Sequence, residues 1–144
     1  MSVRNSQQIF FDTNILVYMQ DSRDISKQQK ARQVFVECVE SNSIVISTQV
    51  LQEYYNVMVN KLKQDKELTK KIIHSFKSNL LVVQVTTELI ENAIEINIKT
   101  GFSFWDSLII STAQASGCNV IYSEDLSDGQ IINGIKIVNP FANE

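Results

Sequence analysis

The sequence is poor in the residues that usually build zinc sites or disulfide-stabilised folds. Its 144 residues include one histidine, two cysteines and one proline. Zinc sites normally combine several Cys and His ligands, and His74, Cys38 and Cys118 show no such spacing. The two cysteines lie far apart in the chain, so they are expected to be buried, reduced thiols, with one bridge between them as the alternative.

Long apolar runs and an overall excess of positive charge are also missing. Asp12 and Asn14 interrupt the nearest candidate for a membrane-spanning segment. Residues 1–8 lack the apolar core of a signal peptide, so we expect a cytoplasmic protein without a membrane partner. The net charge of −3 means that the chain as a whole lacks the basic signature of many nucleic-acid binders.

Positive charge is nevertheless concentrated in one short stretch of the sequence. Its six lysines are Lys61, Lys63, Lys66, Lys70, Lys71 and Lys77. Only Asp65 and Glu67 dilute them, and His74 lies among them as an expected solvated residue. Two interpretations stay open: an ordinary solvated helix surface, or a strip that contacts phosphates.

Short apolar strands alternate with helical patterns along the chain. The expected strands are Ile9–Phe11, Ile44–Ile46, Leu80–Val85, Val120–Tyr122 and Ile135–Val138. Between them we expect a short helical turn at 15–19 and helices at about 26–41, 48–63, 68–77, 87–99 and 103–115. This alternation predicts one α/β domain over residues 1–144, with helices on both faces of a central, mostly parallel sheet of four to five strands.

Two of these helices carry a further prediction. Ser26 is expected to cap the helix that follows it. The helix at 87–99 is expected to bury Leu89, Ile90, Ala93, Ile94 and Ile96.

The first expected strand, Ile9–Phe11, ends abruptly in Asp12, Thr13 and Asn14. In open α/β sheets, ligands bind in the crevice at the carboxyl ends of the strands, where Asp12 is expected. The simpler interpretation is that Asp12 or Asn14 only caps the helix that begins near Ile15.

Three further acids occupy comparable positions, each with a simple structural alternative. Asp125 follows another strand and could serve a turn, whereas Asp106 opens a buried helix in a capping pattern with Ser103. Glu53 lies beside Val57 at the edge of the apolar face of its helix, where a solvated glutamate would be common. In a right-handed parallel sheet these positions can converge on one edge with Asp12.

A cluster of carboxylates favours a divalent cation, because like charges repel more strongly when they are buried. Oxygen ligands without imidazole or thiolate suit Mg²⁺ or Mn²⁺, which take further oxygens from substrate phosphates. Such ions support phosphodiester cleavage. Thr13, Asn14 and Ser123 are then expected to orient the carboxylates or water by hydrogen bonding.

Four segments resemble the motifs of the PIN-domain nucleases, in the same order and with similar spacing. They are Phe11-Asp12-Thr13-Asn14-Ile15-Leu16, Gln52-Glu53, Phe104-Trp105-Asp106-Ser107-Leu108-Ile109 and Tyr122-Ser123-Glu124-Asp125-Leu126. The resemblance spans nearly the whole chain. Within the family it is strongest to the VapC-type toxins of type II toxin–antitoxin systems, which are stand-alone domains of about this size.

This resemblance implies a PIN-like three-layer α/β/α fold and a metal-dependent endoribonuclease acting on single-stranded or loop RNA, such as tRNA, mRNA or rRNA. By position, it implies a catalytic site made of Asp12, Glu53, Asp106 and Asp125, which binds Mg²⁺ or, in its place, Mn²⁺. Asn14 and Ser123 match supporting positions, with Thr13 beside them. The resemblance leaves open whether Glu124 or Asp128 joins or replaces Asp125.

The same resemblance implies protein partners, and two other functions compete with the nuclease. It implies a homodimer and a VapB-like antitoxin whose tail, often carrying Arg or Lys, enters the acidic cleft. The main alternative is a catalytically silent PIN-like domain that binds RNA or protein. A phosphorylated receiver domain is disfavoured, because Asp12 has no adjacent acid and the strand at 80–85 ends in Thr86.

Overall fold

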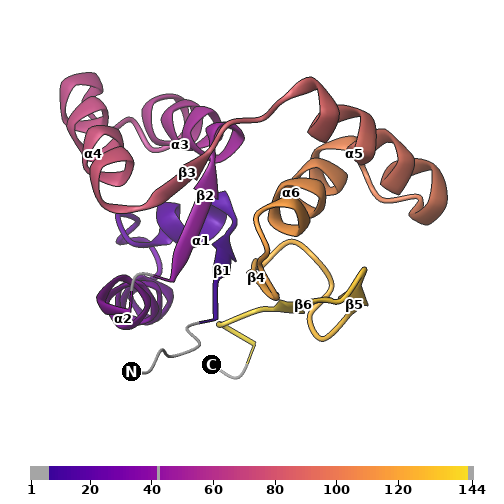
Figure 1. Ribbon diagram of the computed structural model, residues 1–144. Helices are drawn as coiled ribbons and strands as arrows, with labels where there is room; N and C mark the ends of the chain where they lie inside the picture. The colour runs from indigo at the N-terminus through magenta and orange to yellow at the C-terminus, as the bar shows by residue number, and fades with distance from the viewer. Residues whose placement is uncertain (1–6, 42, 143–144) are drawn as a thin grey trace.

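A computed structural model gives the fold of the protein and describes residues 7–41 and 43–142 (Figure 1). Most of the stretch considered for a signal peptide, residues 1–6, therefore lies outside the described residues. Within the described part of the chain, no helix is long and apolar enough to cross a membrane.

The centre of the fold is one twisted sheet with the strand order β3-β2-β1-β4-β6-β5. Its strands, in chain order, are β1 (Ile9–Phe11), β2 (Ile44–Ser47), β3 (Leu81–Val83), β4 (Val120–Tyr122), β5 (Ile131–Ile132) and β6 (Ile135–Val138). All neighbouring pairs are parallel except β5 with β6. The prediction of an α/β fold with a central, mostly parallel sheet is confirmed.

Strand β5 was not expected from the sequence, which indicated only a polar loop before β6. Ile132 pairs with Ile135, so the two residues between them form a two-residue hairpin turn. Asn133 and Gly134 both have positive φ angles, 51° and 84°. Asn-Gly is favoured in such turns because these two residues adopt positive φ most readily. The signal for β5 was therefore present in the sequence.

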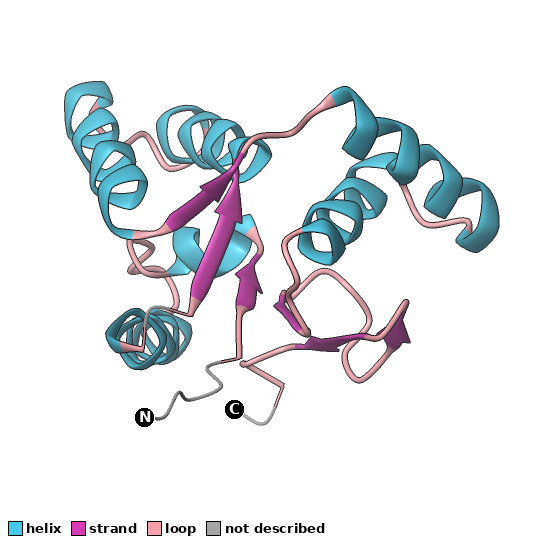
Figure 2. Ribbon diagram, in the orientation of Figure 1, coloured by secondary structure: helices cyan, strands magenta, loops and turns pink. Residues whose placement is uncertain are grey.

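Six helices surround the sheet in the described residues. They are α1 (Thr13–Tyr18), α2 (Ile25–Glu40), α3 (Thr48–Asn60), α4 (Lys66–Asn79), α5 (Thr87–Thr100) and α6 (Phe104–Ala115). Figure 2 shows α2, α3 and α4 gathered on one side of the sheet and α5 and α6 on the other.

Polar side chains at the helix N-termini fix where most of these helices begin. Ser47, Thr86 and Ser103 accept hydrogen bonds from the first turns of α3, α5 and α6, and the capping pattern at Ser103 was expected from the sequence. The expected cap of α2 was wrong: Asp24, not Ser26, accepts the hydrogen bond of the Lys27 N–H. Asp65 caps α4 in the same way, which starts that helix at Lys66.

The core lies between the sheet and the helices on both sides. Phe10 and Phe11 of β1 and Tyr54 of α3 are fully buried in it. Cys38 and Cys118 are buried free thiols, so the expectation of reduced cysteines is confirmed and burial raises the pKa of each.

The expected buried face of α5 was partly wrong. Ala93 and Ile96 are buried and Leu89 is half-buried, but Ile90 and Ile94 are 37% and 44% exposed. Helix α5 packs mainly against α6, so one neighbouring helix covers only a narrow stripe of its surface (Figure 1).

Candidate active site

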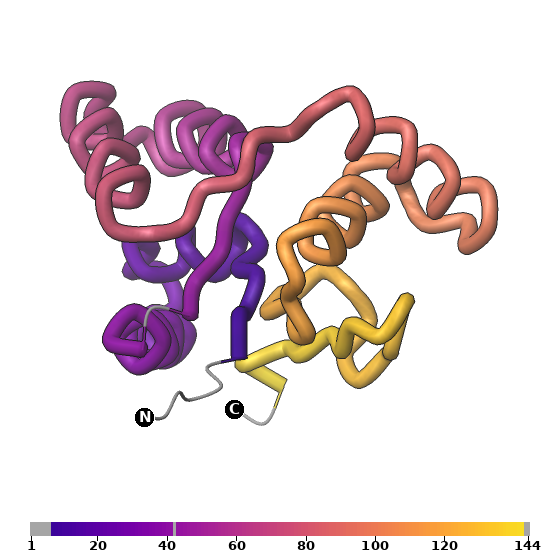
Figure 3. The backbone as a smooth tube through the Cα atoms, in the orientation of Figure 1, coloured from indigo at the N-terminus to yellow at the C-terminus, as the bar shows by residue number. Residues whose placement is uncertain are grey.

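The candidate site begins where β1 and β4 end side by side. The strands are parallel, and Phe11 is in register with Tyr122. Figure 3 shows these two segments, distant in the sequence, running next to each other in the middle of the molecule. The residues that follow, Asp12 and Ser123, therefore emerge at the same level of the sheet edge, and the Asp12 N–H donates to the Tyr122 carbonyl across 2.9 Å.

Asp12 is a buried carboxylate held by neutral donors. Its Oδ1 accepts the Thr13 N–H at 2.8 Å, so Asp12 does cap α1, and its Oδ2 accepts the Ser123 hydroxyl at 2.7 Å. Burial raises the pKa of Asp12 to about 6; these two hydrogen bonds oppose the shift, and the charges of Glu53 and Asp125 add to it. Capping and a place in the site are thus compatible roles.

Asn14 connects two of the acids through its side-chain amide. The Nδ2 group donates to Oδ2 of Asp125 at 3.0 Å and makes a longer contact of 3.4 Å to Oδ2 of Asp12. Its Oδ1 accepts the N–H of Glu124 at 3.1 Å, which fixes the loop after β4. One turn of α1 therefore holds together the polar residues at the ends of β1 and β4.

Glu53 reaches the same place from α3. Its Oε1 accepts the Thr13 hydroxyl at 2.6 Å, and its Oε2 accepts the amide of Gln49 at 3.1 Å. Gln49 lies one helical turn before Glu53, and its amide also approaches the Trp105 carbonyl at 3.3 Å. The Oε1 atom of Gln49 is buried and has no hydrogen-bond partner in the described residues.

Gln49 is the residue that sequence reasoning missed. Its signal was the i, i+4 spacing from Glu53, which places two residues on one helix face. A glutamine at that spacing is common on helices, so the pattern by itself does not reveal a site.

Asp106 comes from the other side of the sheet, in the first turn of α6. The Ser103 hydroxyl accepts the Asp106 N–H at 3.1 Å, as in the expected capping pattern. Partial burial raises the pKa of Asp106, and the charges of Asp125 and Glu53 raise it further. These charges act on Asp106 because the three carboxylates face one space.

That space is a cavity of about 370 Å³. It is lined by Asp12, Thr13, Asn14, Val17, Gln49, Glu53, Val57, Trp105, Asp106, Ile109 and Asp125. All four acids singled out in the sequence therefore meet at the walls of one cavity. Ser123 does not line it but supports Asp12 from behind.

The other two acids considered near Asp125 serve different structural purposes. Glu124 forms an ion pair with Lys27 and accepts the Tyr18 hydroxyl at 2.6 Å. Asp128 accepts the N–H of Asn139 at 2.7 Å and so holds a loop. Neither acid lines the cavity, whereas Asp125 does.

The donor set of the cavity is typical of sites for Mg²⁺, Mn²⁺ or Ca²⁺ and not of zinc sites. It offers carboxylate and amide oxygens without imidazole or thiolate. Both ion pairs among the described residues, Arg23–Asp21 and Lys27–Glu124, lie outside it, so the buried Asp12 has no cation beside it. Within the described part, no group of three or more His, Cys, Asp or Glu is arranged to hold a metal ion. Mg²⁺ does not require such a group, because it usually binds one or two carboxylates and keeps several waters.

Known structures share this architecture. The sarcin-ricin loop cleaving toxin VapC20 of Mycobacterium tuberculosis has a TM-score of 0.67 at 18% identity, covering 82% of this chain and 90% of that one. A toxin–antitoxin complex from Klebsiella pneumoniae has a TM-score of 0.67 at 21% identity and covers 93% and 98% of the two chains. The structure of DNA-bound VapBC from Salmonella typhimurium has a TM-score of 0.67 at 20% identity. The match covers 92% of this chain and 97% of that one.

Sequence comparison gives a more direct assignment. No curated protein sequence matches the chain. The family model of the PIN domain, however, matches residues 9–127, a span that contains the four acids of the cavity and the strands and helices that carry them. The chain therefore belongs to the PIN domain family.

Proposed function

We propose that the protein is a metal-dependent endoribonuclease, the toxin of a VapBC-type toxin–antitoxin pair. The observation that carries this proposal is the convergence of Asp12, Glu53, Asp106 and Asp125 on one cavity at the carboxyl edge of the sheet. Membership of the PIN family and the shared fold with VapC toxins support it.

In this proposal the polar residues hold the carboxylates at fixed positions before substrate arrives. Ser123 and the Thr13 N–H hold Asp12, while the Thr13 hydroxyl and Gln49 hold Glu53. Preorganised groups need no rearrangement during the reaction, so their electrostatic effect on a developing charge is larger than in water.

Asp12 and Asp125 would hold the divalent cation, since Asn14 already joins them, with Asp106 and Glu53 on the cavity walls around them. The chemistry that Mg²⁺ or Mn²⁺ supplies in such a site is neutralisation of phosphate charge and polarisation of the reacting oxygens. A cation would also favour the ionised form of Asp12, which burial disfavours. Asp106 and Glu53 would orient the attacking water by accepting its hydrogen bonds.

The proposed substrate is single-stranded or loop RNA. The cavity opens at the edge of the sheet and carries the exposed indole of Trp105, on which an unstacked base could stack. A base held in this way would place a neighbouring phosphate near the carboxylates.

The proposed partner is a VapB-like antitoxin whose tail enters the cavity. The uncompensated charge of the carboxylates suits an Arg or Lys of that tail, because a cation would offset their mutual repulsion. In this proposal the toxin is a cytoplasmic homodimer. The alternative is a PIN domain that binds RNA or protein without cleaving.

The test is incubation of the purified protein with a mixed RNA pool in Mg²⁺ or Mn²⁺, with EDTA and Asp106→Asn as controls. We expect discrete fragments, lost in EDTA and reduced by at least about a hundred-fold in Asp106→Asn. Glu40→Gln is the matched control, because it removes one exposed carboxylate at the end of α2, outside the cavity. Intact RNA despite metal binding would support the non-cleaving alternative.

A further inference from the structure

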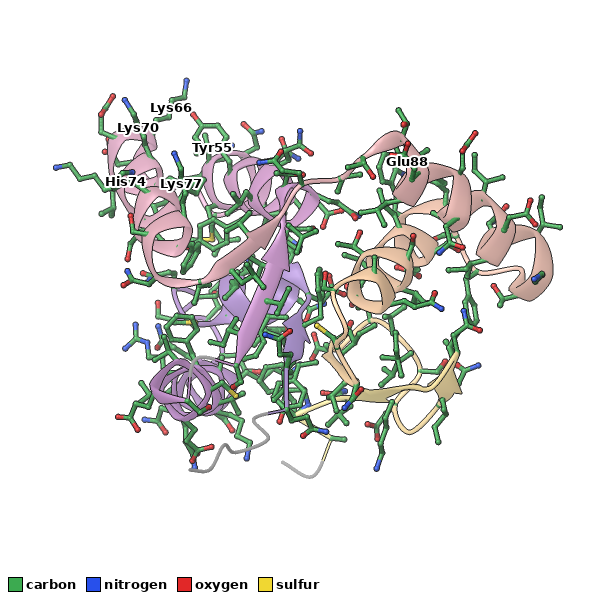
Figure 4. The ribbon with its side chains drawn as sticks, viewed as in Figure 1. Tyr55, Lys66, Lys70, His74, Lys77 and Glu88 are labelled. Carbon is green, nitrogen blue, oxygen red and sulfur yellow. The ribbon has the colours of Figure 1, made fainter. Side chains whose placement is uncertain are left out.

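The surface of α4 carries a row of three lysines and a histidine on one flank. Lys66, Lys70, His74 and Lys77, named here the α4 strip, follow the spacing i, i+4, i+8 and i+11. At 100° per residue these positions fall within about 80° of one another, and the row extends roughly 16 Å along the helix. Figure 4 shows the four side chains along one helix, and all four residues are exposed.

Among the described residues, no lysine of the strip is held in an ion pair by a neighbouring acid. Glu67 stands four residues before Lys71 and three before Lys70, the spacings at which ion pairs form on a helix. Neither ion pair among the described residues includes a lysine of α4. An ordinary solvated helix of mixed charge would be expected to pair some of these groups, so the positive potential of the strip is largely free to act on a ligand.

An exposed aromatic residue lies next to the strip. Tyr55 of α3 is 38% exposed, and in the view of Figure 4 it projects toward Lys66 and Lys77 of the adjoining helix α4. The neighbouring residue Tyr54 packs edge-on against Phe76 of α4, with ring centroids 5.2 Å apart. This buried contact holds the two helices together, and therefore fixes Tyr55 relative to the strip.

A groove lined by amide and carboxylate side chains and by Trp105 adjoins the candidate active site. It has a volume of about 300 Å³ and is lined by Gln49, Gln52, Glu53, Asn56 and Trp105. Gln49, Glu53 and Trp105 also line the acidic cavity, so the two hollows lie side by side. Gln52, which lines the groove, precedes Tyr55 by three residues on α3, and side chains at this spacing are neighbours on a helix surface, so one end of the groove lies next to Tyr55.

We propose that the α4 strip, Tyr55 and this groove form the path along which single-stranded RNA reaches the acidic cavity. Lysines that follow a backbone and aromatic rings on which bases stack are the combination that binds single strands without strict sequence preference. Phosphates contact the strip, one base stacks on Tyr55, and the amides of Gln52 and Asn56 face the nucleotides that lead to Trp105. The strip thus supplies local positive charge for binding RNA, although the net charge of the whole chain is −3. This path rests on the proposed ribonuclease function.

Binding can be measured separately from cleavage. The probe is a fluorescein-labelled, mixed-sequence RNA of about 16 nucleotides, followed by anisotropy in EDTA at several salt concentrations. The variant Lys66→Gln, Lys70→Gln, Lys77→Gln is expected to bind on the order of ten-fold more weakly. Its log-affinity should also depend less steeply on log salt, by about 2 in slope, because each single-strand phosphate contact contributes about 0.7.

The matched control is the variant Lys30→Gln, Lys99→Gln, Lys136→Gln, which removes the same charge from α2, α5 and β6. It should bind nearly as well as the unmodified protein. Tyr55→Ala should weaken binding on the order of ten-fold without changing the salt slope, and Tyr55→Phe should restore it, since stacking needs the ring.

Three results would overturn the path: equal losses in both lysine variants, no loss in either, or equally strong competition by duplex RNA or duplex DNA. Circular dichroism of each variant shows whether the fold is kept. If the protein cleaves RNA but the strip variant binds RNA as well as the unmodified protein, the path is rejected and the nuclease function stands. If binding depends on the strip but no RNA is cleaved, the nuclease function is rejected and the strip remains an RNA-binding surface.

Discussion

The hydroxyl of Ser123 donates a hydrogen bond to Oδ2 of Asp12 across 2.7 Å, joining the carboxyl ends of β4 and β1. Both residues are buried, so this contact is screened little by water. The same oxygen of Ser123 accepts the N–H groups of Asp125 and Leu126 at 3.1 and 3.3 Å. One buried hydroxyl therefore couples the position of the Asp12 carboxylate to the loop that carries Asp125.

The ionisation of Asp12 should make stability fall as pH rises. Its pKa is about 6 in the folded chain against an ordinary value of 3.8, because burial disfavours the charge. The folded state therefore binds the proton more tightly, and the stabilisation present below pH 3.8 is lost as pH rises to about 6, at most roughly 3 kcal/mol. Urea unfolding from pH 4 to 7 in EDTA should show this loss in the unmodified protein and not in Asp12→Asn. Parallel pH profiles for the two proteins would contradict it.

Divalent cations should raise the melting temperature. A ligand that binds only the folded state at a hundred times its dissociation constant adds about 2.7 kcal/mol of stability. For a domain of this size that corresponds to a shift of roughly 5 to 10 °C. The measurement is a melting curve at pH 7 with Mg²⁺ or Mn²⁺ against EDTA. Asp12→Asn should lose most of the shift and Glu40→Gln should keep it; a metal-independent curve in the unmodified protein would reject the cation site.

Gln49→Ala should lower cleavage without unfolding the protein. The variant removes the amide that donates hydrogen bonds to Oε2 of Glu53 and to the Trp105 carbonyl. Glu53 on α3 and Trp105 on α6 are then less firmly positioned at the cavity. Because Glu53 is proposed to orient the attacking water, the cleavage rate should fall ten- to a hundred-fold, the typical cost of losing an outer-shell group in a metal site. Initial cleavage rates and metal titrations would measure it. Unchanged values for both would show that Thr13 alone positions Glu53.

Asp125 and Glu124 should separate in function although they are neighbours in the sequence. Asp125→Asn is expected to abolish cleavage, because this carboxylate lines the cavity. Glu124→Gln is expected to keep cleavage and lose about 1 kcal/mol of stability, because its partly exposed ion pair with Lys27 is outside the cavity. Parallel cleavage and urea-unfolding assays of the two variants decide the matter. A cleavage defect in Glu124→Gln alone would reverse the assignment.

Apart from β5, the order of strands and helices could be predicted because each segment carries its own signal. Buried β-branched strands such as Ile44–Ile46 and caps such as Ser47 act over a few residues, so local physics determines them. The choice of Asp24 over Ser26 as a cap was missed because both are good caps and only the helix start decides between them. The exposure of Ile90 and Ile94 was missed because it depends on what α5 packs against. In the structure α5 packs mainly against α6 and not against the sheet, which leaves these two residues uncovered.

By itself, the sequence determined most elements of the fold, the absence of Cys/His zinc spacing and the identity of the four candidate site acids. Only the tertiary structure decided that these acids line one cavity, because the parallel register of β1 and β4 brings Asp12 beside Ser123 across more than a hundred residues of chain. It also gave Gln49 its place beside Glu53 and Trp105, and separated Asp125 from Glu124 and Asp128. Such contacts depend on strand order and helix packing, which no short stretch of sequence encodes.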